Sequence, residues 1–407
     1  MSWAIALVFG LTYALIAARR LAILPIGRPA GALAGAVAMV AVGALTPEQS
    51  FAAIDYDTLA LLLGMMLLSV YLERSGSFAR LTAALLRRFN RPMSLLMALS
   101  VGAAGLSAFL VNDTVCLFAT PLVVRICVAA RLPLSPFLLA LASSANIGSA
   151  ATLVGNPQNM IIGGMSGLGF LPFMTAALPA VAVALAINLG LLWALFRGRL
   201  PATMPTVTLA SAASDGRLGS TMVVMTGVIA GLFAGLHPGY VALGGAVLLM
   251  LRDREEPNEV FLKVDWSLLL FFAALFVVVA GARSTGVIEA LWAISKGYVG
   301  LEGWSGLVGF AALVTAGSNL LSNVPFVLIM GEHAGELGAG ALPWVMLAFV
   351  STIAGNLTLL GSVANIIVAE GARGHYQLGF WEYLRFGALS TALTLAGGVA
   401  TLWWWLG

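Results

Sequence analysis

Residues 54–81 read IDYDTLALLLGMMLLSVYLERSGSFARL, and residues 264–291 read VDWSLLLFFAALFVVVAGARSTGVIEAL. The two stretches align without gaps, with Asp55 on Asp265. Similarity between two apolar helices is common, but three further matches follow in the same order. They are LVNDT at 110–114 on LSNVP at 321–325, Asn146 on Asn356, and, after a four-residue slip, GNPQNMII at 155–162 on GSVANIIV at 361–368. The chain therefore contains an internal repeat.

The composition places this repeat in a membrane. Of the 407 residues, 60% are hydrophobic and 9% are charged, whereas a soluble domain has roughly 45–50% apolar and 25% charged residues. A soluble fold of this size could not bury so much apolar surface. The sequence predicts an all-α, polytopic membrane protein. Spans are expected at 3–18, 30–46, 58–72, 172–196, 219–236, 240–251, 265–283 and 383–406.

The distribution of positive charge predicts the orientation of the repeat. With the N-terminus outside and one crossing per span, every lysine and arginine except Arg283 and Lys296 falls on one face. The positive-inside rule makes that face cytoplasmic. Asp55 then lies outside and Asp265 inside. We therefore expect the repeat to be inverted.

This threading requires two re-entrant hairpins, at 92–130 and 303–338, each entering and leaving the membrane on one side. A simple crossing of the first would place Arg91 and Arg125 on opposite faces, whereas a hairpin places both inside. The expected organisation is N-terminal helices at 1–46, a first repeat at 47–196, a linker with connecting helices at 197–256, and a second repeat at 257–407.

Polar residues at membrane depth gather at the two hairpin tips and in two interrupted apolar stretches, 136–165 and 342–373. We expect these stretches to be broken transmembrane helices. A break leaves backbone groups unpaired, so it persists only where it is buried in protein or lines a cavity. Paired broken helices in corresponding halves indicate a transporter binding site near the midplane.

The candidate binding residues are the amide and hydroxyl side chains of the tips and breaks. They are Asn112, Asn323, Asn146, Asn156, Asn159, Asn356, Ser362 and Asn365. Their alternative roles are interhelical hydrogen bonding and, for the two tip asparagines, closing the turn. Four further residues are expected to shape the backbone at the site, namely Gly155, Pro157, Pro325 and Gly361.

Asp113 is the only ionisable residue that this threading places at the site, and no arginine reaches the midplane. A buried carboxylate is costly in its charged form, which makes Asp113, with Thr114 beside it, the candidate for proton or ion coupling. The alternative is that Asp113 caps the second helix of its hairpin.

Several kinds of protein are excluded or not expected. No phosphate-binding loop is present, so ATP-driven pumping by this chain alone is excluded. An intramembrane protease would need a catalytic pair at depth, and an enzyme is not expected. The histidines fall at span ends, so we expect no metal site and no cofactor, and nothing in the sequence indicates nucleic acid as a partner.

The tips and breaks resemble one known group of transporters. VNDTVCLFATPLVV at 111–124, NPQNMIIGGMSGLGF at 156–170 and SNVP at 322–325 are similar to motifs of the ion transporter superfamily, specifically its arsenite permease (ArsB) and NhaD group. The resemblance implies two scaffold–transport halves that move a small ion coupled to protons or sodium. It also implies substrate contacts at Asn112, Asp113 and Asn323, and leaves open a homodimer or an energising ATPase subunit as partners.

We therefore expect a secondary active transporter of a bacterial inner membrane that exports arsenite or antimonite in exchange for protons. The neutral trihydroxide As(OH)3 requires hydrogen-bonding amides rather than an arginine. The alternatives on the same scaffold are sodium/proton antiport and cation-coupled transport of an inorganic or carboxylate anion. The alternative of a different class is a passive channel.

The inverted topology predicts the accessibility of two engineered cysteines. A cysteine at Ser77 should react with an impermeant reagent only from the cytoplasm, and one at Gly300 only from outside. Labelling of both from the same side would refute the topology.

Overall fold

The computed structural model describes residues 2–18, 27–205, 217–254, 256–283 and 286–407. These residues form helices and no strands. Within them, seven helices are long and apolar enough to cross a membrane. The predicted all-α, polytopic membrane fold is confirmed.

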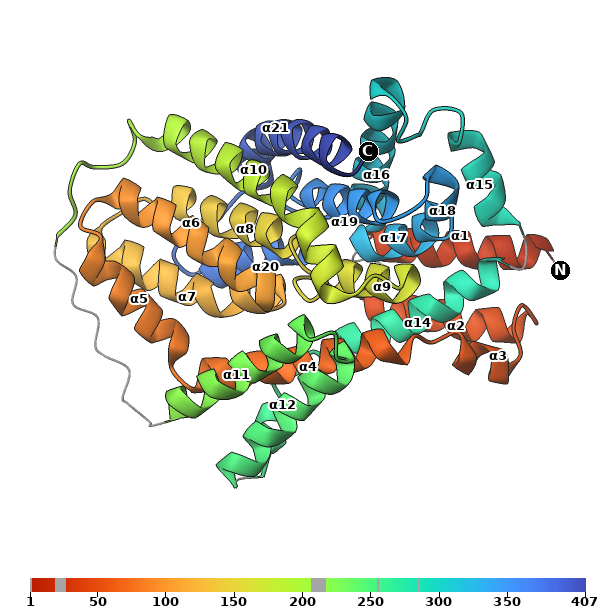
Figure 1. The fold of residues 1–407 in the computed structure, drawn as a ribbon, viewed down its shortest axis with the longest axis horizontal. Coiled ribbons are helices and arrows are strands. Elements are labelled where there is room, and N and C mark those ends of the chain that lie inside the picture. The colour runs from red at the N-terminus through yellow and green to blue at the C-terminus, as the bar shows by residue number, and fades with distance from the viewer. Residues whose placement is uncertain (1, 19–26, 206–216, 255, 284–285) are drawn as a thin grey trace.

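The first half of the chain contains ten of the described helices (Figure 1). They are α1 (Ser2–Ala18), α2 (Arg28–Ala41), α3 (Pro47–Ala52), α4 (Tyr56–Arg74), α5 (Ser77–Arg88), α6 (Pro92–Phe109), α7 (Asn112–Ala130), α8 (Leu134–Ser149), α9 (Pro157–Ser166) and α10 (Phe170–Phe196).

The second half follows the same order from its first helix to its last, with one additional short helix, α18, among the described residues. Its helices are α11 (Arg217–Phe233), α12 (Pro238–Asp253), α13 (Asn258–Phe261), α14 (Trp266–Arg283), α15 (Val287–Ser295), α16 (Trp304–Leu321), α17 (Asn323–Gly331), α18 (Ala334–Leu337), α19 (Leu342–Ala354), α20 (Val363–Ala372) and α21 (Phe380–Leu406).

Helices of one half pack reciprocally against helices of the other. α2 packs on α14, and its counterpart α12 packs on α4. In the same way, α7 packs on α20, and α17 packs on α9. The long helices α10 and α21 lie side by side along the upper edge of Figure 1. Such reciprocal contacts are those of two units related by a two-fold axis, and they extend to α2 and α12, which the sequence prediction left outside the repeats.

The two hairpins turn sharply between their helices. α6 ends at Phe109 and α7 begins at Asn112, while α16 ends at Leu321 and α17 begins at Asn323. In the second hairpin the turn residue is Ser322, with φ of 81°, a left-handed conformation that non-glycine residues rarely adopt. Asn323 is therefore the first residue of a helix rather than the residue that makes the turn.

The breaks separate α8 from α9 and α19 from α20. In each half the chain leaves the helix and, after seven residues in the first half and eight in the second, begins another, shorter helix, at Pro157 and Val363. The re-entrant hairpins and the inversion of the halves across the membrane remain predictions. The reciprocal packing of the helices supports them.

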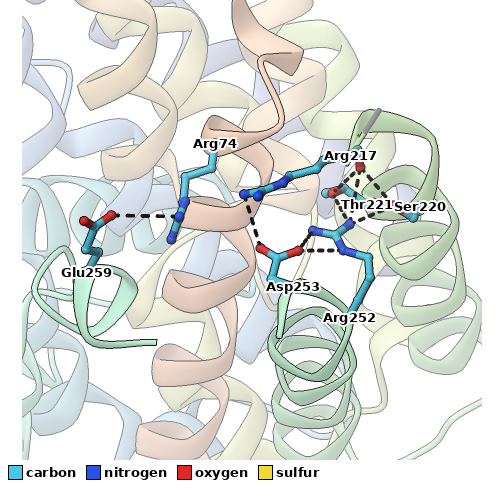
Figure 2. Close-up of polar contacts among 7 residues, drawn as sticks. All are labelled: Arg74, Arg217, Ser220, Thr221, Arg252, Asp253 and Glu259. Atoms are coloured by element: carbon cyan, nitrogen blue, oxygen red, sulfur yellow. Dashed lines mark hydrogen bonds and ion pairs between the residues drawn. The ribbon is translucent and has the colours of Figure 1, made fainter. Parts of the chain in front are cut away.

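A buried carboxylate lies where the last turn of α12 meets the first turn of α11 (Figure 2). The side chain of Asp253 is only 6% exposed and lies between two guanidinium groups. Nε of Arg252 donates to Asp253 Oδ1 at 2.8 Å, and Nη1 of Arg217 is 3.8 Å from Oδ2. Arg252 also donates to the hydroxyls of Ser220 and Thr221, at 2.8 and 2.9 Å. This network fixes α11 to α12.

Replacing Asp253 should destabilise the fold. In Asp253→Asn, the guanidinium group of Arg252 loses its buried counter-charge and that of Arg217 loses one ion-pair partner. We expect this to cost about 2 kcal/mol and to lower the melting temperature of the purified protein by several degrees. The matched control is Glu370→Gln, because Glu370 forms an exposed ion pair with Arg373, and exposed pairs contribute about 0–1 kcal/mol. Equal melting temperatures for the two variants would contradict this assignment.

Candidate functional site

At each break, an asparagine of the following helix donates hydrogen bonds to the backbone carbonyl groups that the break leaves without a helical partner. Asn159 and Asn365 lie one turn inside α9 and α20, and their amide groups reach back across the break. The bonds run from Asn159 Nδ2 to the carbonyls of Ser149 (3.2 Å) and Thr152 (2.9 Å), and from Asn365 Nδ2 to those of Gly355 (2.8 Å) and Thr358 (3.0 Å). The pattern is the same in both halves after the four-residue slip. These two asparagines therefore stabilise the breaks.

Glycine and proline shape the breaks in the way the sequence predicts. A Cβ at Gly155 would overlap the carbonyl oxygen of Ser149, and a Cβ at Gly361 would lie 2.7 Å from that of Gly355. Only glycine allows the backbone to approach so closely. Pro157 occupies the first position of α9, where its missing N–H costs nothing.

Asn156 is the N-cap of α9. Its side-chain oxygen accepts from the backbone N–H of Asn159 at 2.9 Å, and its amide donates to the hydroxyls of Ser149 (3.0 Å) and Thr352 (3.2 Å). Because Thr352 belongs to α19, this cap connects the two broken helices.

Asn146 is the centre of the polar network. Its Oδ1 accepts from Asn112 Nδ2 at 2.9 Å and from Ser362 Oγ at 3.1 Å. Its Nδ2 donates to Asn356 Oδ1 at 2.8 Å and to Asn365 Oδ1 at 3.0 Å. All four hydrogen-bonding positions of this amide are filled, so Asn146 has none left for a substrate.

Asn146 and Asn356 are 210 residues apart and occupy equivalent positions of the two halves. A residue that bonds to its own counterpart must lie close to the axis that relates the halves. The network is therefore centred on the point where α8 and α19 meet, and both side chains are at most 1% exposed.

A cavity of about 140 Å³ adjoins this network, between the hairpin tips and the second helices of the breaks. The described residues that line it are Arg28, Pro29, Asn112, Asp113, Pro157, Gln158, Asp265, Ser267, Leu268, Phe271, Phe272, Ser322, Asn323, Val324, Gly361, Ser362 and Val363.

Helix N-termini converge on this cavity. Among its lining residues are the first residues of α7, α9, α17 and α20, which are Asn112, Pro157, Asn323 and Val363. The N-terminus of a helix carries unpaired N–H groups and a partial positive charge. The cavity thus presents hydrogen-bond donors that suit electron-rich oxygen atoms.

Acceptors face the same space. The Oδ1 atoms of Asn112 and Asn323 are buried and have no hydrogen-bond partner. The carboxylate-bearing residue Asp113 lines the same cavity. A buried polar atom without a partner is costly, and the two amide oxygens, one from each tip, are therefore available to a ligand that carries O–H groups or to a cation.

The predicted site residues divide into two sets. Those at the cavity are Asn112, Asp113, Asn323, Ser362, Pro157 and Gly361. Those in the network or backbone away from the cavity lining are Asn146, Asn156, Asn159, Asn356, Asn365, Thr114, Gly155 and Pro325. For the asparagines of the second set, the interhelical bonding that the sequence left as an alternative is the role that their contacts support.

Sequence reasoning missed two charged residues. It made Asp113 the only ionisable group at the site, but Arg28 and Asp265 also line the cavity. Both stand where a helix begins, Arg28 as the first residue of α2 and Asp265 just before α14. The prediction was wrong because the cavity reaches these helix ends, which a threading of straight spans places at the membrane surface. Gln158, which lines the cavity and donates to Thr352 at 3.1 Å, was also missed.

Comparison with known proteins identifies the family. Residues 13–354 match the citrate transporter family, CitMHS. The chain belongs to this family. It is 33% identical to the silicon efflux transporter LSI3 of Oryza sativa subsp. japonica, over 96% of this chain and 95% of the relative. It is 30% identical to the putative transporter arsB of Dictyostelium discoideum, over 92% of this chain and 87% of the relative.

The fold also matches a solved structure. The crystal structure of the Alcanivorax borkumensis YdaH transporter, which is described as having an unusual topology, aligns with a TM-score of 0.54 at 16% identity and covers 100% of this chain and 97% of its own. The chain is thus a secondary transporter of the citrate transporter family, related to arsB-like proteins, and not an enzyme.

The central position of Asn146 predicts a large effect on stability. Asn146→Ala leaves the amide groups of Asn112, Asn356 and Asn365 without their partner, at a cost of about 3 kcal/mol. We expect a clear fall in the melting temperature of the purified protein. Asn258→Ala is the control, since Asn258 is exposed and bonds only to Glu256. A melting temperature equal to that of wild type would show that the network contributes little.

Proposed function

We propose that this transporter exports a small, uncharged hydroxy acid of a metalloid, arsenite or antimonite as As(OH)3 or Sb(OH)3, in exchange for protons. The observation that carries the proposal is the pairing of helix N-termini with unpartnered amide oxygens around one cavity. Each hydroxyl of such a solute donates one hydrogen bond and accepts others. A cavity wall that offers both hydrogen-bond donors and acceptors suits such a solute better than a wall with donors alone or acceptors alone.

The charges at the cavity argue against a multiply charged anion. Among the described residues, its ionisable lining residues are one arginine, Arg28, and two acids, Asp113 and Asp265. A tricarboxylate such as citrate would meet more negative than positive side-chain charge, and the partial charges of the helix ends would have to compensate for all of it. A neutral solute avoids this cost.

The names of two relatives agree with this chemistry. One relative is a silicon efflux transporter and the other is a putative arsB transporter. Silicic acid, Si(OH)4, is likewise a small, neutral, hydroxylated solute, and it is the second candidate substrate for the same cavity. Sodium/proton antiport and coupled transport of a singly charged anion remain alternatives on this scaffold.

Asp113 is the candidate for proton coupling because the tips differ at this position. The first tip carries Asp113, whereas the second tip carries Val324 at the matching place. Asp113 lines the same cavity as Asn112 and Asn323, whose amide oxygens have no partner, and as Val363 at the start of α20. A proton bound by Asp113 and a solute bound by the amides would therefore compete for neighbouring positions, which is the requirement for antiport.

The test is arsenite accumulation in everted vesicles under an imposed inside-acid pH gradient. Wild type should accumulate arsenite, and an uncoupler should abolish the accumulation. Asp113→Asn should lose it, because an amide cannot release the proton, but should keep arsenite exchange between equal concentrations on the two sides. Glu302→Gln, at an exposed position, is the matched control and should behave as wild type.

Each alternative has its own outcome. Full coupled accumulation by Asp113→Asn would remove this residue from the coupling mechanism. Arsenite flux that never exceeds equilibration would indicate a channel. Accumulation driven by sodium, or of silicic acid but not arsenite, would reassign the coupling ion or the substrate on the same vesicles.

A further inference from the structure

An apolar groove lies away from the transport cavity, between α5 and the first hairpin. It is lined by residues of α5, α6, α7 and α8, all of them apolar or glycine, including Leu85, Leu95, Gly102, Leu106 and Ile126. Among the described lining residues there is no hydrogen-bonding side chain. Such a groove does not suit a polar solute, but it suits a hydrocarbon chain.

The groove runs along the direction of α6. From Leu95 to Leu106 it extends over eleven residues, which at 1.5 Å per residue is about 16 Å. This approximates the length of an extended acyl chain in one leaflet, which is half of a hydrocarbon core about 30 Å thick. Leu106 is close to the hairpin tip, and Leu95 is in the first turn of α6.

Arginines stand at the Leu95 end. Arg88 follows Leu85 by three residues on α5, Arg91 precedes Leu95 by four residues at the N-cap of α6, and Arg125 follows Leu122 by three residues on α7. All three are exposed, and in the described part of the chain none of them forms an ion pair. Positions three or four apart on a helix share a face, so these cations border the groove.

The charge imbalance extends over this whole part of the molecule. Between residues 75 and 200 the sequence contains Arg80, Arg87, Arg88, Arg91, Arg125, Arg131, Arg197 and Arg199, but no acidic residue other than Asp113. Asp113 lies at the transport cavity. This segment of the sequence thus supplies no carboxylate to balance its exposed arginines.

We propose that this groove is a binding site for one anionic phospholipid. An acyl chain occupies the groove, and the phosphate contacts Arg88, Arg91 and Arg125. Guanidinium groups form charge-assisted hydrogen bonds with phosphate, and exposed basic residues at a membrane surface attract anionic lipids. The combination of an apolar groove along the membrane depth with unpaired cations at its end fits a lipid, whereas a soluble phosphate would use the arginines alone.

The site can be blocked without disturbing the helices around it. A Cβ at Gly102 meets no atom within 4 Å, and the same is true at Gly105 on the same helix. Only Gly102 lines the groove. Gly102→Leu should therefore fill the groove, while Gly105→Leu adds the same side chain outside it.

The measurement is the melting temperature of the purified full-length protein in detergent, with added phosphatidylglycerol, phosphatidylcholine or soluble glycerol 3-phosphate. A ligand that binds only the folded protein raises this temperature. Phosphatidylglycerol should raise it by about 5 °C in wild type and in Gly105→Leu, and by less than half as much in Gly102→Leu. Phosphatidylcholine and glycerol 3-phosphate should have little effect.

A second variant keeps the proposal testable if Gly102→Leu does not fold. The triple change Arg88→Gln, Arg91→Gln and Arg125→Gln leaves the groove open and should abolish the preference for phosphatidylglycerol. The control is the double change Arg197→Gln and Arg199→Gln, which removes two guanidinium groups that stack on Trp193 and Phe196. This variant should retain the preference for phosphatidylglycerol. An equal response to both lipids, an equal response of the two leucine variants, or stabilisation by glycerol 3-phosphate would overturn the proposal.

Discussion

The structure depends on the requirement that backbone groups released inside an apolar environment must find partners there. Two helices are interrupted at the level of the polar network, and lipid offers no hydrogen bonds to the freed carbonyls. Side-chain amides meet this requirement, since an amide donates and accepts without carrying charge. Asn159 and Asn365 bond the carbonyls, Asn156 caps α9, and Asn146 links both breaks to the first hairpin. The open helix ends that remain form the wall of the cavity.

The same arrangement explains why the halves can share a backbone yet differ in chemistry. Equivalent amides hold the breaks in both halves, so the framework is two-fold in character. The tips are not equivalent, because Asp113 matches Val324. The network that includes Asp253 also has no match, since Gly43 stands at the corresponding position of the first half. At these two places the halves therefore differ in side chains that project from a common framework.

Much of this could be predicted from the sequence. The ranges predicted for hairpins and breaks correspond to the helix pairs α6–α7, α16–α17, α8–α9 and α19–α20, because apolar runs and Gly-Asn-Pro interruptions mark where helices end. Their re-entrant, inverted arrangement stays a prediction. The sequence could not separate Asn112, whose oxygen is free, from Asn146, whose bonds are all satisfied. That difference depends on contacts between residues more than 200 positions apart. Arg28 and Asp265 were missed for a related reason, since only the packing of α2 on α14 brings their helix ends to the cavity.

The bond between Asn146 and Asn356 has a consequence for how such a chain can change. An amide can pair with a copy of itself, because one group donates while the other accepts; two carboxylates or two ammonium groups cannot do so without a proton shared or lost. A single replacement by an apolar residue leaves the opposite amide without this partner, so one half cannot lose its amide without a cost to the other. The pair on the axis therefore restricts single substitutions to side chains that can still hydrogen-bond an amide.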